Sequence, residues 1–154
     1  MLPEGILELS NISVADPAAS KKRILEQAAL LLAAHNEEPS AEQIFERLLE
    51  RERLGSTGLA GGVALPHARM PGIQETRGAF LRLVEAVEFD ALDGKPVDLV
   101  FALLVPEDAT EEHLQLLAQL AAMFNDEELR DQLRVAEAEE ALAILTGRST
   151  TDAA

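Results

Sequence analysis

One segment of the chain gathers residue types that can bind an anion and act as a nucleophile. Residues 51–69, RERLGSTGLAGGVALPHAR, place four glycines and the small hydroxyl side chains of Ser56 and Thr57 ahead of His67. Glycines let a backbone approach a ligand closely, and small hydroxyls add hydrogen bonds. A histidine with a pKa of about 6.5 is largely neutral near pH 7 and can attack an electrophilic phosphorus without a separate base. A loop histidine beside glycine turns fits the same residues equally well.

The residues directly before His67 stiffen the backbone that carries it. Pro66 has a fixed φ and no N–H, and it pushes Leu65 toward an extended conformation. Residues 62–65 are predicted to be a strand, which places His67 in the loop that leaves the strand. Ligands of α/β folds collect at such strand ends.

Four further side chains are candidates for holding an anion beside His67. His113 lies in the first turns of a helix predicted from Asp108, where unsatisfied N–H groups and the helix dipole favour negative charge. A surface histidine beside acidic neighbours is equally consistent with these residues. Arg51 has a planar fork that suits a phosphoryl group, and Arg53 and Arg69 share this property. Ordinary surface ion pairs are the alternative for all three arginines.

Other chemistries find little support. His35, at the end of the first predicted helix, is interpreted as a helix-capping residue. The chain has no G-x-x-x-x-G-K-[ST], G-x-S-x-G or H-E-x-x-H motif, and it has no cysteine. A zinc site from His67, His113 and a carboxylate has no support from ligand spacing. We therefore expect neither metal nor cofactor.

Composition limits the class of protein and of partner. The 154 residues, 47% hydrophobic and 27% charged, predict one soluble domain over residues 1–154, with a core over about 10–146. A formal net charge of −15 disfavours nucleic acid and anionic membranes and favours a basic protein partner. The N-terminus lacks a signal-peptide pattern, and no apolar run approaches the roughly 20 residues of a membrane span. We expect a cytoplasmic protein.

The pattern of apolar residues predicts an α/β fold, with one mixed sheet sandwiched by helices on both faces. Residues 99–105, LVFALLV, are apolar throughout, as in a strand buried on both faces. Further strands are expected at 12–15, 62–65, 78–84 and 87–89. Ser20, Ser40 and Asp108 are the expected N-caps of three helices. Two short helices are expected at 126–134 and 137–145, and the tail 149–154 is expected to be frayed.

An ordered set of motifs resembles the fructose/mannitol type of phosphotransferase-system enzyme IIA, in particular its nitrogen-regulatory branch. The resemblance covers roughly residues 10–145 and is highly specific as a set. The motifs are SKKR at 20–23, RE at 51–52, GSTG at 55–58, ALPH at 64–67, DALDGKPVDLVFALLVP at 90–106, and HL at 113–114.

The resemblance implies a function and a role for each site residue. His67 would accept a phosphoryl group, through Nε2, from a phosphohistidine on a small histidine-containing phosphocarrier protein. His113 would help to hold that group, and Arg51 would have an accessory electrostatic role. No metal would be needed. The fold implied is the α/β sandwich already expected from the residues.

The resemblance leaves the output of the protein open. No enzyme IIB domain is fused to this sequence, so regulation of target proteins in nitrogen metabolism or ion transport, according to phosphorylation state, is the expectation. The alternatives are a sugar-specific enzyme IIA that passes phosphate to a separate enzyme IIB, and a binding module that is never phosphorylated. Two features depart from the family: there is little sequence before the first strand, and Ala68 replaces a glycine often found after the histidine.

Overall fold

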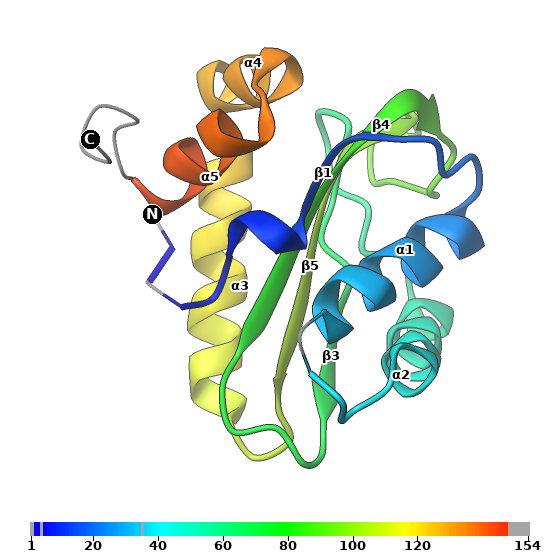
Figure 1. Cartoon of the computed structure of the whole chain (residues 1–154). Coiled ribbons are helices and arrows are strands. Elements are labelled where there is room, and N and C mark those ends of the chain that lie inside the picture. The colour runs from blue at the N-terminus through cyan, green and yellow to red at the C-terminus, as the bar shows by residue number, and fades with distance from the viewer. Residues whose placement is uncertain (1, 4, 35, 148–154) are drawn as a thin grey trace.

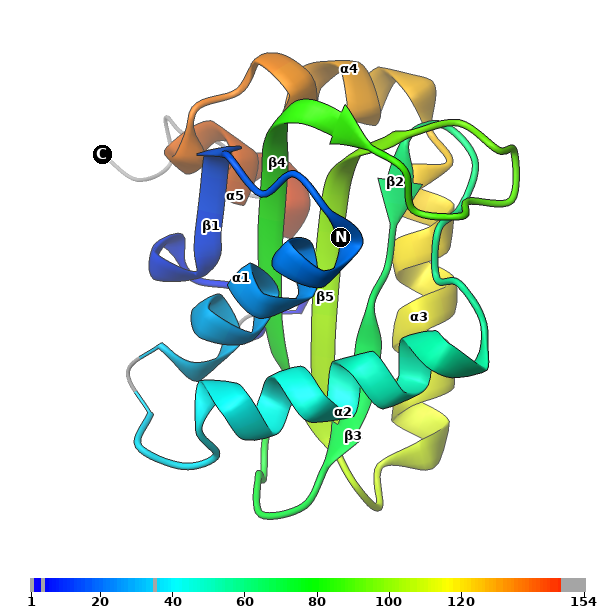
Figure 2. The same cartoon turned by 90° about the vertical axis from the view of Figure 1, so that its right-hand side faces the viewer.

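A five-stranded mixed sheet forms the centre of the computed structural model, which describes residues 2–3, 5–34 and 36–147. The strand order is β1-β4-β5-β2, and β3 continues the edge by pairing with β5 beyond β2 (Figure 2). β4 is antiparallel to β5, while β1 is parallel to β4 and both β2 and β3 are parallel to β5. The strands are β1 (Ile12–Asp16), β2 (Val63–Ala64), β3 (His67–Met70), β4 (Arg77–Val87) and β5 (Val97–Pro106).

Strand β5 lies between the two hydrophobic cores, as its uninterrupted apolar sequence predicts. Val100, Ala102 and Leu104 belong to one buried cluster. Phe101 and Leu103 belong to the other. Successive side chains of a strand point to opposite faces, so a strand that is covered on both sides must be apolar at every position.

Helices cover both faces of the sheet, which confirms the predicted fold class (Figures 1 and 2). α1 and α2 contribute to the cluster on one face, whereas α3, α4 and α5 contribute to the cluster on the other. The short helix η1 (Leu9–Asn11) precedes β1. The helices are α1 (Lys21–Ala33), α2 (Ala41–Leu54), α3 (Thr110–Phe124), α4 (Glu127–Val135) and α5 (Ala138–Thr146). None of the described helices has the length and apolar character of a membrane span.

Two of the three predicted N-caps are confirmed. The Ser20 hydroxyl accepts from Arg23 N at 3.2 Å. Ser40 and Gln43 form a reciprocal capping box with bonds of 3.2 and 2.9 Å. The prediction for Asp108 is wrong, because α3 begins one residue later and Ala109 occupies its N-cap without a side-chain bond.

The predicted strand at 62–65 is shorter in the structure and is followed by a strand that was not predicted. β2 covers only Val63–Ala64, and pairing with β5 resumes at His67, opposite Leu103. Pro66 has no N–H to donate to a ladder, although its carbonyl still accepts from Leu103 N at 2.9 Å. His67 therefore begins β3 rather than lying in a loop.

The prediction of a separate edge strand at 87–89 is also wrong. β4 runs without a break from Arg77 to Val87, and Glu88 and Phe89 lie outside any strand. The predictions for His35 and for the frayed tail at 149–154 concern residues outside the described part of the chain.

Candidate functional site

The backbone around Pro66 fixes the His67 ring. Nδ1 of His67 lies 2.8 Å from the carbonyl oxygen of Leu65. A carbonyl oxygen can only accept a hydrogen bond, so Nδ1 carries the proton of the neutral imidazole and Nε2 holds the lone pair. The side chain is half-buried. The sequence Leu-Pro-His thus sets the tautomer in which Nε2 is the nucleophilic nitrogen.

The structure brings His113 against His67. The two ring centroids are 5.1 Å apart, and the rings are tilted by 56°. His113 projects from the first turns of α3 and is only 6% exposed. Its Nδ1 is buried without a hydrogen-bond partner in the described part of the chain. A buried polar atom left in this way favours the arrival of a group with which it can pair.

Burial and nearby cations hold both imidazoles in the neutral form. Desolvation is the main cause of the lowered pKa of His67; the Leu65 hydrogen bond and Glu52 oppose it, and Arg51 adds to it. Desolvation also lowers the pKa of His113, with further lowering from the charges of His67, Arg69 and Arg51. Each ring therefore stays uncharged to a lower pH than a free histidine.

The histidine pair opens into a hollow with a basic lining. Its volume is about 620 Å³. Four arginines contribute to it on a chain whose formal net charge is −15, so the local charge is opposite in sign to the whole. An anion is favoured in such a place. The lining residues are Arg47, Glu50, Arg51, Arg53, Leu54, His67, Ala68, Arg69 and His113.

The candidate arginines all lie in this hollow. Arg51, Arg53 and Arg69 each line it, as expected for side chains near a bound anion. Arg51 is held by a 2.9 Å bond from its Nη1 to the carbonyl of Gly55. Arg51 is also the one arginine whose charge lowers the pKa of both histidines. Among these arginines, Arg51 therefore acts electrostatically on both histidines of the pair.

Ala68 makes a contact that the sequence did not indicate. Although Ala68 borders the hollow, it is 7% exposed and belongs to the core beneath α1 and α2. Residues alternate along β3, so the methyl group of Ala68 points away from the face that carries His67.

The hydroxyl residues Ser56 and Thr57 do not line the hollow, although they were candidates for the loop around it. The Ser56 hydroxyl donates to the Phe89 carbonyl at 2.6 Å. The Thr57 hydroxyl donates to Glu52 Oε2 at 2.7 Å. The loop reaches the site through its backbone instead, because the Thr57 carbonyl accepts from Leu65 N at 3.0 Å.

Glu52 is a site-supporting residue that the sequence reasoning missed. Its carboxylate is buried, accepts from Thr57 N at 2.8 Å, and pairs with Lys21 Nζ at 2.9 Å. An ion pair and hydrogen bonds thus connect Lys21 through Glu52, Thr57 and Leu65 to His67. A signal was present in the sequence: Glu52 lies four residues after Leu48 and eight after Ile44, on the buried stripe of α2.

The alternative zinc site gains no support from the structure. Among the described residues, no group of three or more histidine, cysteine or acidic side chains is placed to hold a metal ion.

Comparison with known proteins agrees with this fold. The model of the family "Phosphoenolpyruvate-dependent sugar phosphotransferase system, EIIA 2" matches residues 5–147. A relative in Pseudomonas aeruginosa, "Nitrogen regulatory protein", is 54% identical over 139 residues, 90% of each chain. A "PTS system fructose-specific EIIA component" of Haloferax volcanii is 34% identical over 88% of each chain. The crystal structure of "Nitrogen Regulatory Protein IIA-Ntr" from Neisseria meningitidis is 51% identical, with a TM-score of 0.86, covering 92% of this chain and 97% of that one.

The chain is a small α/β protein with a mixed sheet between two layers of helices and a basic hollow beside a pair of histidines. The chain belongs to the EIIA type 2 family of the phosphoenolpyruvate-dependent phosphotransferase system, and its similarity includes the nitrogen-regulatory branch of that family.

Proposed function

We propose that this chain is a phosphocarrier that accepts a phosphoryl group on Nε2 of His67 from the phosphohistidine of a small carrier protein. The observation that carries the proposal is the 2.8 Å bond between Nδ1 of His67 and the Leu65 carbonyl, which leaves the Nε2 lone pair for attack. The lowered pKa of His67 supports it, because the neutral ring is the nucleophile.

The chemistry proposed is a direct transfer between two imidazoles. The Nε2 lone pair of His67 forms a new N–P bond while the N–P bond of the donor breaks, and the donor nitrogen keeps that electron pair. Transfer in this way needs chiefly positioning and stabilisation of the charge on the phosphoryl oxygens. Arg51 and His113 supply that stabilisation from the hollow. No metal or cofactor takes part.

The output proposed is regulation of target proteins according to phosphorylation state. A phosphoryl group brings roughly −1.5 to −2 charges to a hollow lined with arginines, so the two forms present different surfaces to a partner. The relatives named nitrogen regulatory protein support this output. Transfer onward to a separate enzyme IIB is the second candidate, and the similarity to a fructose-specific EIIA component supports it.

Intact-mass analysis tests the proposal. The chain is mixed with enzyme I, the histidine-containing phosphocarrier protein and phosphoenolpyruvate. A gain of one phosphate, about 80 Da, that is lost on acidification is expected for a phosphohistidine. No gain in the presence of demonstrably phosphorylated donor would reject the phosphocarrier and leave a binding module that is never phosphorylated.

Replacing Arg51 with alanine is expected to slow phosphoryl uptake by about 10- to 100-fold. A hydrogen bond to a charged group contributes about 1.5–3 kcal/mol, and each 1.4 kcal/mol corresponds to a factor of ten. Arg53→Ala is the matched control, because Arg53 lines the same hollow but does not shift the pKa of either histidine. Rates come from mass spectra taken at fixed times. Equal slowing in both variants would show that general charge, and not Arg51 itself, matters.

Phosphorylation of His67 is expected to raise the pKa of His113. In the free protein, burial is the main cause that holds this pKa below 6.5, and the electrostatic effects of His67, Arg69 and Arg51 add to it. A negatively charged phosphoryl group on the adjacent ring favours the imidazolium form, so the pKa of His113 should rise. An NMR titration of the ring protons, with and without phosphorylation, measures both values. An unchanged pKa would mean that His113 does not contact the phosphoryl group.

A further inference from the structure

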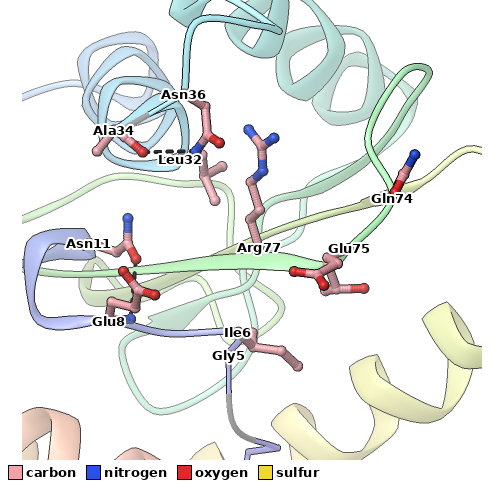
Figure 3. A pocket seen from close by; sticks show the side chains of 11 residues that line it. Gly5, Ile6, Glu8, Asn11, Leu32, Ala34, Asn36, Gln74, Glu75 and Arg77 are labelled. Atoms are coloured by element: carbon pink, nitrogen blue, oxygen red, sulfur yellow. Dashed lines mark hydrogen bonds between the residues drawn. The ribbon is translucent and has the colours of Figure 1, made fainter.

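A second hollow, separate from the one around His67, lies where the N-terminal segment meets the end of α1 and the start of β4 (Figure 3). Its volume is about 430 Å³, within the usual range of small-molecule sites. Gly5 and Ile6 border one side, Leu32 and Asn36 another, and residues 74–77 a third. No residue that lines it also lines the hollow of the two histidines.

Hydrogen bonds hold the walls of this hollow in place. Gly78 N donates to the carbonyl of Ile6 at 2.8 Å and ties the N-terminal segment to β4. The Asn11 amide donates to the Leu31 carbonyl at 2.8 Å and ties η1 to α1. The Asn36 amide donates to the Ala34 carbonyl at 2.9 Å beyond the helix end. The hollow is therefore formed before any ligand arrives.

Arg77 brings a positive charge to this hollow, and one of its guanidinium nitrogens has no hydrogen-bond partner among the described residues. Its side chain rises from β4 past Leu32 toward the end of α1 in Figure 3. Nη1 of Arg77 is buried and has no hydrogen-bond partner among the described residues. By contrast, Arg82 donates to the Leu133 carbonyl at 2.7 Å, and Arg134 pairs with Asp98 at 2.9 Å. A buried guanidinium nitrogen without an acceptor favours an incoming anion, and a carboxylate matches the fork of the arginine side chain.

Negative groups surround the outer part of the same hollow. Glu8 and Glu75 line it and are exposed. α1 also ends here, and its last turn contains no basic residue, so its terminal carbonyls add to the negative groups. A ligand with only negative charge would be repelled by these groups. A ligand that also carries a positive group would be attracted at both ends.

We propose that this hollow binds a small zwitterion of the α-amino acid class. The carboxylate of the ligand pairs with Arg77, and its ammonium group lies toward Glu8, Glu75 and the last carbonyls of α1. This site shares no lining residue with the hollow around His67, so the binding of a small molecule here does not require phosphoryl transfer.

NMR titration with matched probes tests the site in the full chain. The probes are L-alanine, propionate, which lacks the ammonium group, and ethylammonium, which lacks the carboxylate; larger L-amino acids extend the series. We expect saturable amide shifts at Gly5, Asn36, Thr76 and Arg77 with the amino acids. We expect at least tenfold weaker binding of propionate and ethylammonium. Arg77→Met should weaken amino acid binding at least tenfold, and Arg77→Lys should weaken it less.

Arg23→Met is the matched control, because Arg23 has a 71% exposed side chain and makes only a surface pair with Glu26. It should bind the amino acids like the wild type. The proposal is overturned if no amino acid gives saturable shifts in the wild type, if propionate binds as well as alanine, or if Arg77→Met binds as tightly as Arg23→Met. If Arg77→Met does not fold, Arg77→Lys and the wild-type probe series decide the question.

Discussion

The His67→Ala variant is expected to take up no phosphoryl group under conditions in which the wild type is fully modified. The substitution removes the Nε2 lone pair, and without it the new N–P bond cannot form at this site. His67 is half-buried at the start of an edge strand, so its replacement should leave the sheet intact. Intact mass gives the result directly, as the presence or absence of a gain of about 80 Da.

The neighbouring histidine provides the control for this experiment. His113→Ala keeps the nucleophile and removes a stabilising ring 5.1 Å away, so uptake should be slower but should still reach one phosphate per chain. Losing a stabilising partner of the charge that develops in transfer slows such reactions by about 10²–10³-fold. Uptake of one phosphate by His67→Ala would move the acceptor to another residue. Complete loss of phosphoryl uptake in His113→Ala as well would show that both histidines are essential for uptake.

The parts of the fold that follow from local pattern were predicted well. The apolar run of residues 99–105 predicts β5. Ser20 was predicted as an N-cap from the helical apolar pattern that follows it, and Ser40 from its capping-box spacing to Gln43. Each of these features depends on residues within a few positions of one another. The start of α3 was misplaced because Ala109 makes no side-chain bond that a sequence pattern could reveal.

The arrangement around His67 depends on contacts that are distant in the sequence. β3 exists because β5 offers it a parallel partner opposite His67 and Ala68, a register that the short run His67–Met70 does not encode by itself. Likewise, His113 was a candidate because it lies near the start of a predicted helix. Its contact with His67 results from the packing of α3 against the sheet. The sequence could name these residues, but only the fold brings them together.

The segment before His67 was identified from the sequence, but the role of its hydroxyl side chains was not. Ser56 and Thr57 were candidates because small hydroxyls suit an anion, yet both donate to internal acceptors. The carboxylate that engages Thr57 comes from Glu52, one residue after the arginine that drew attention. Charged residues are almost never fully buried unless they are paired, so a lone glutamate on an apolar stripe was itself a sign of a partner.

Glu52→Ala is expected to lower the free energy of unfolding by about 2–3 kcal/mol. Removing one member of a buried ion pair typically costs about 3–5 kcal/mol, and the partial exposure of Lys21 reduces this figure. The exposed fractions of the two side chains are 26% for Lys21 and 3% for Glu52. The variant also leaves the Thr57 hydroxyl and amide without their acceptor. Urea unfolding at an unchanged m-value measures the difference.

The exposed pair Arg23–Glu26 supplies the matched control. Its side chains are 71% and 33% exposed, so Glu26→Ala should change the unfolding free energy by less than about 0.5 kcal/mol. Equal destabilisation by the two variants would contradict a special role for Glu52.

The same variant also reports on the site, because the negative charge of Glu52 raises the pKa of His67. Removing that charge should lower the pKa of His67 further below 6.5, an effect that a purely structural loss far from the ring would not produce. An NMR titration of His67 in Glu52→Ala and in Glu26→Ala separates the two explanations. A lowered pKa in Glu52→Ala alone would show that the contacts from Lys21 to His67 set both the position and the charge state of the acceptor ring. The same pKa in both variants would limit Glu52 to stabilising the end of α2.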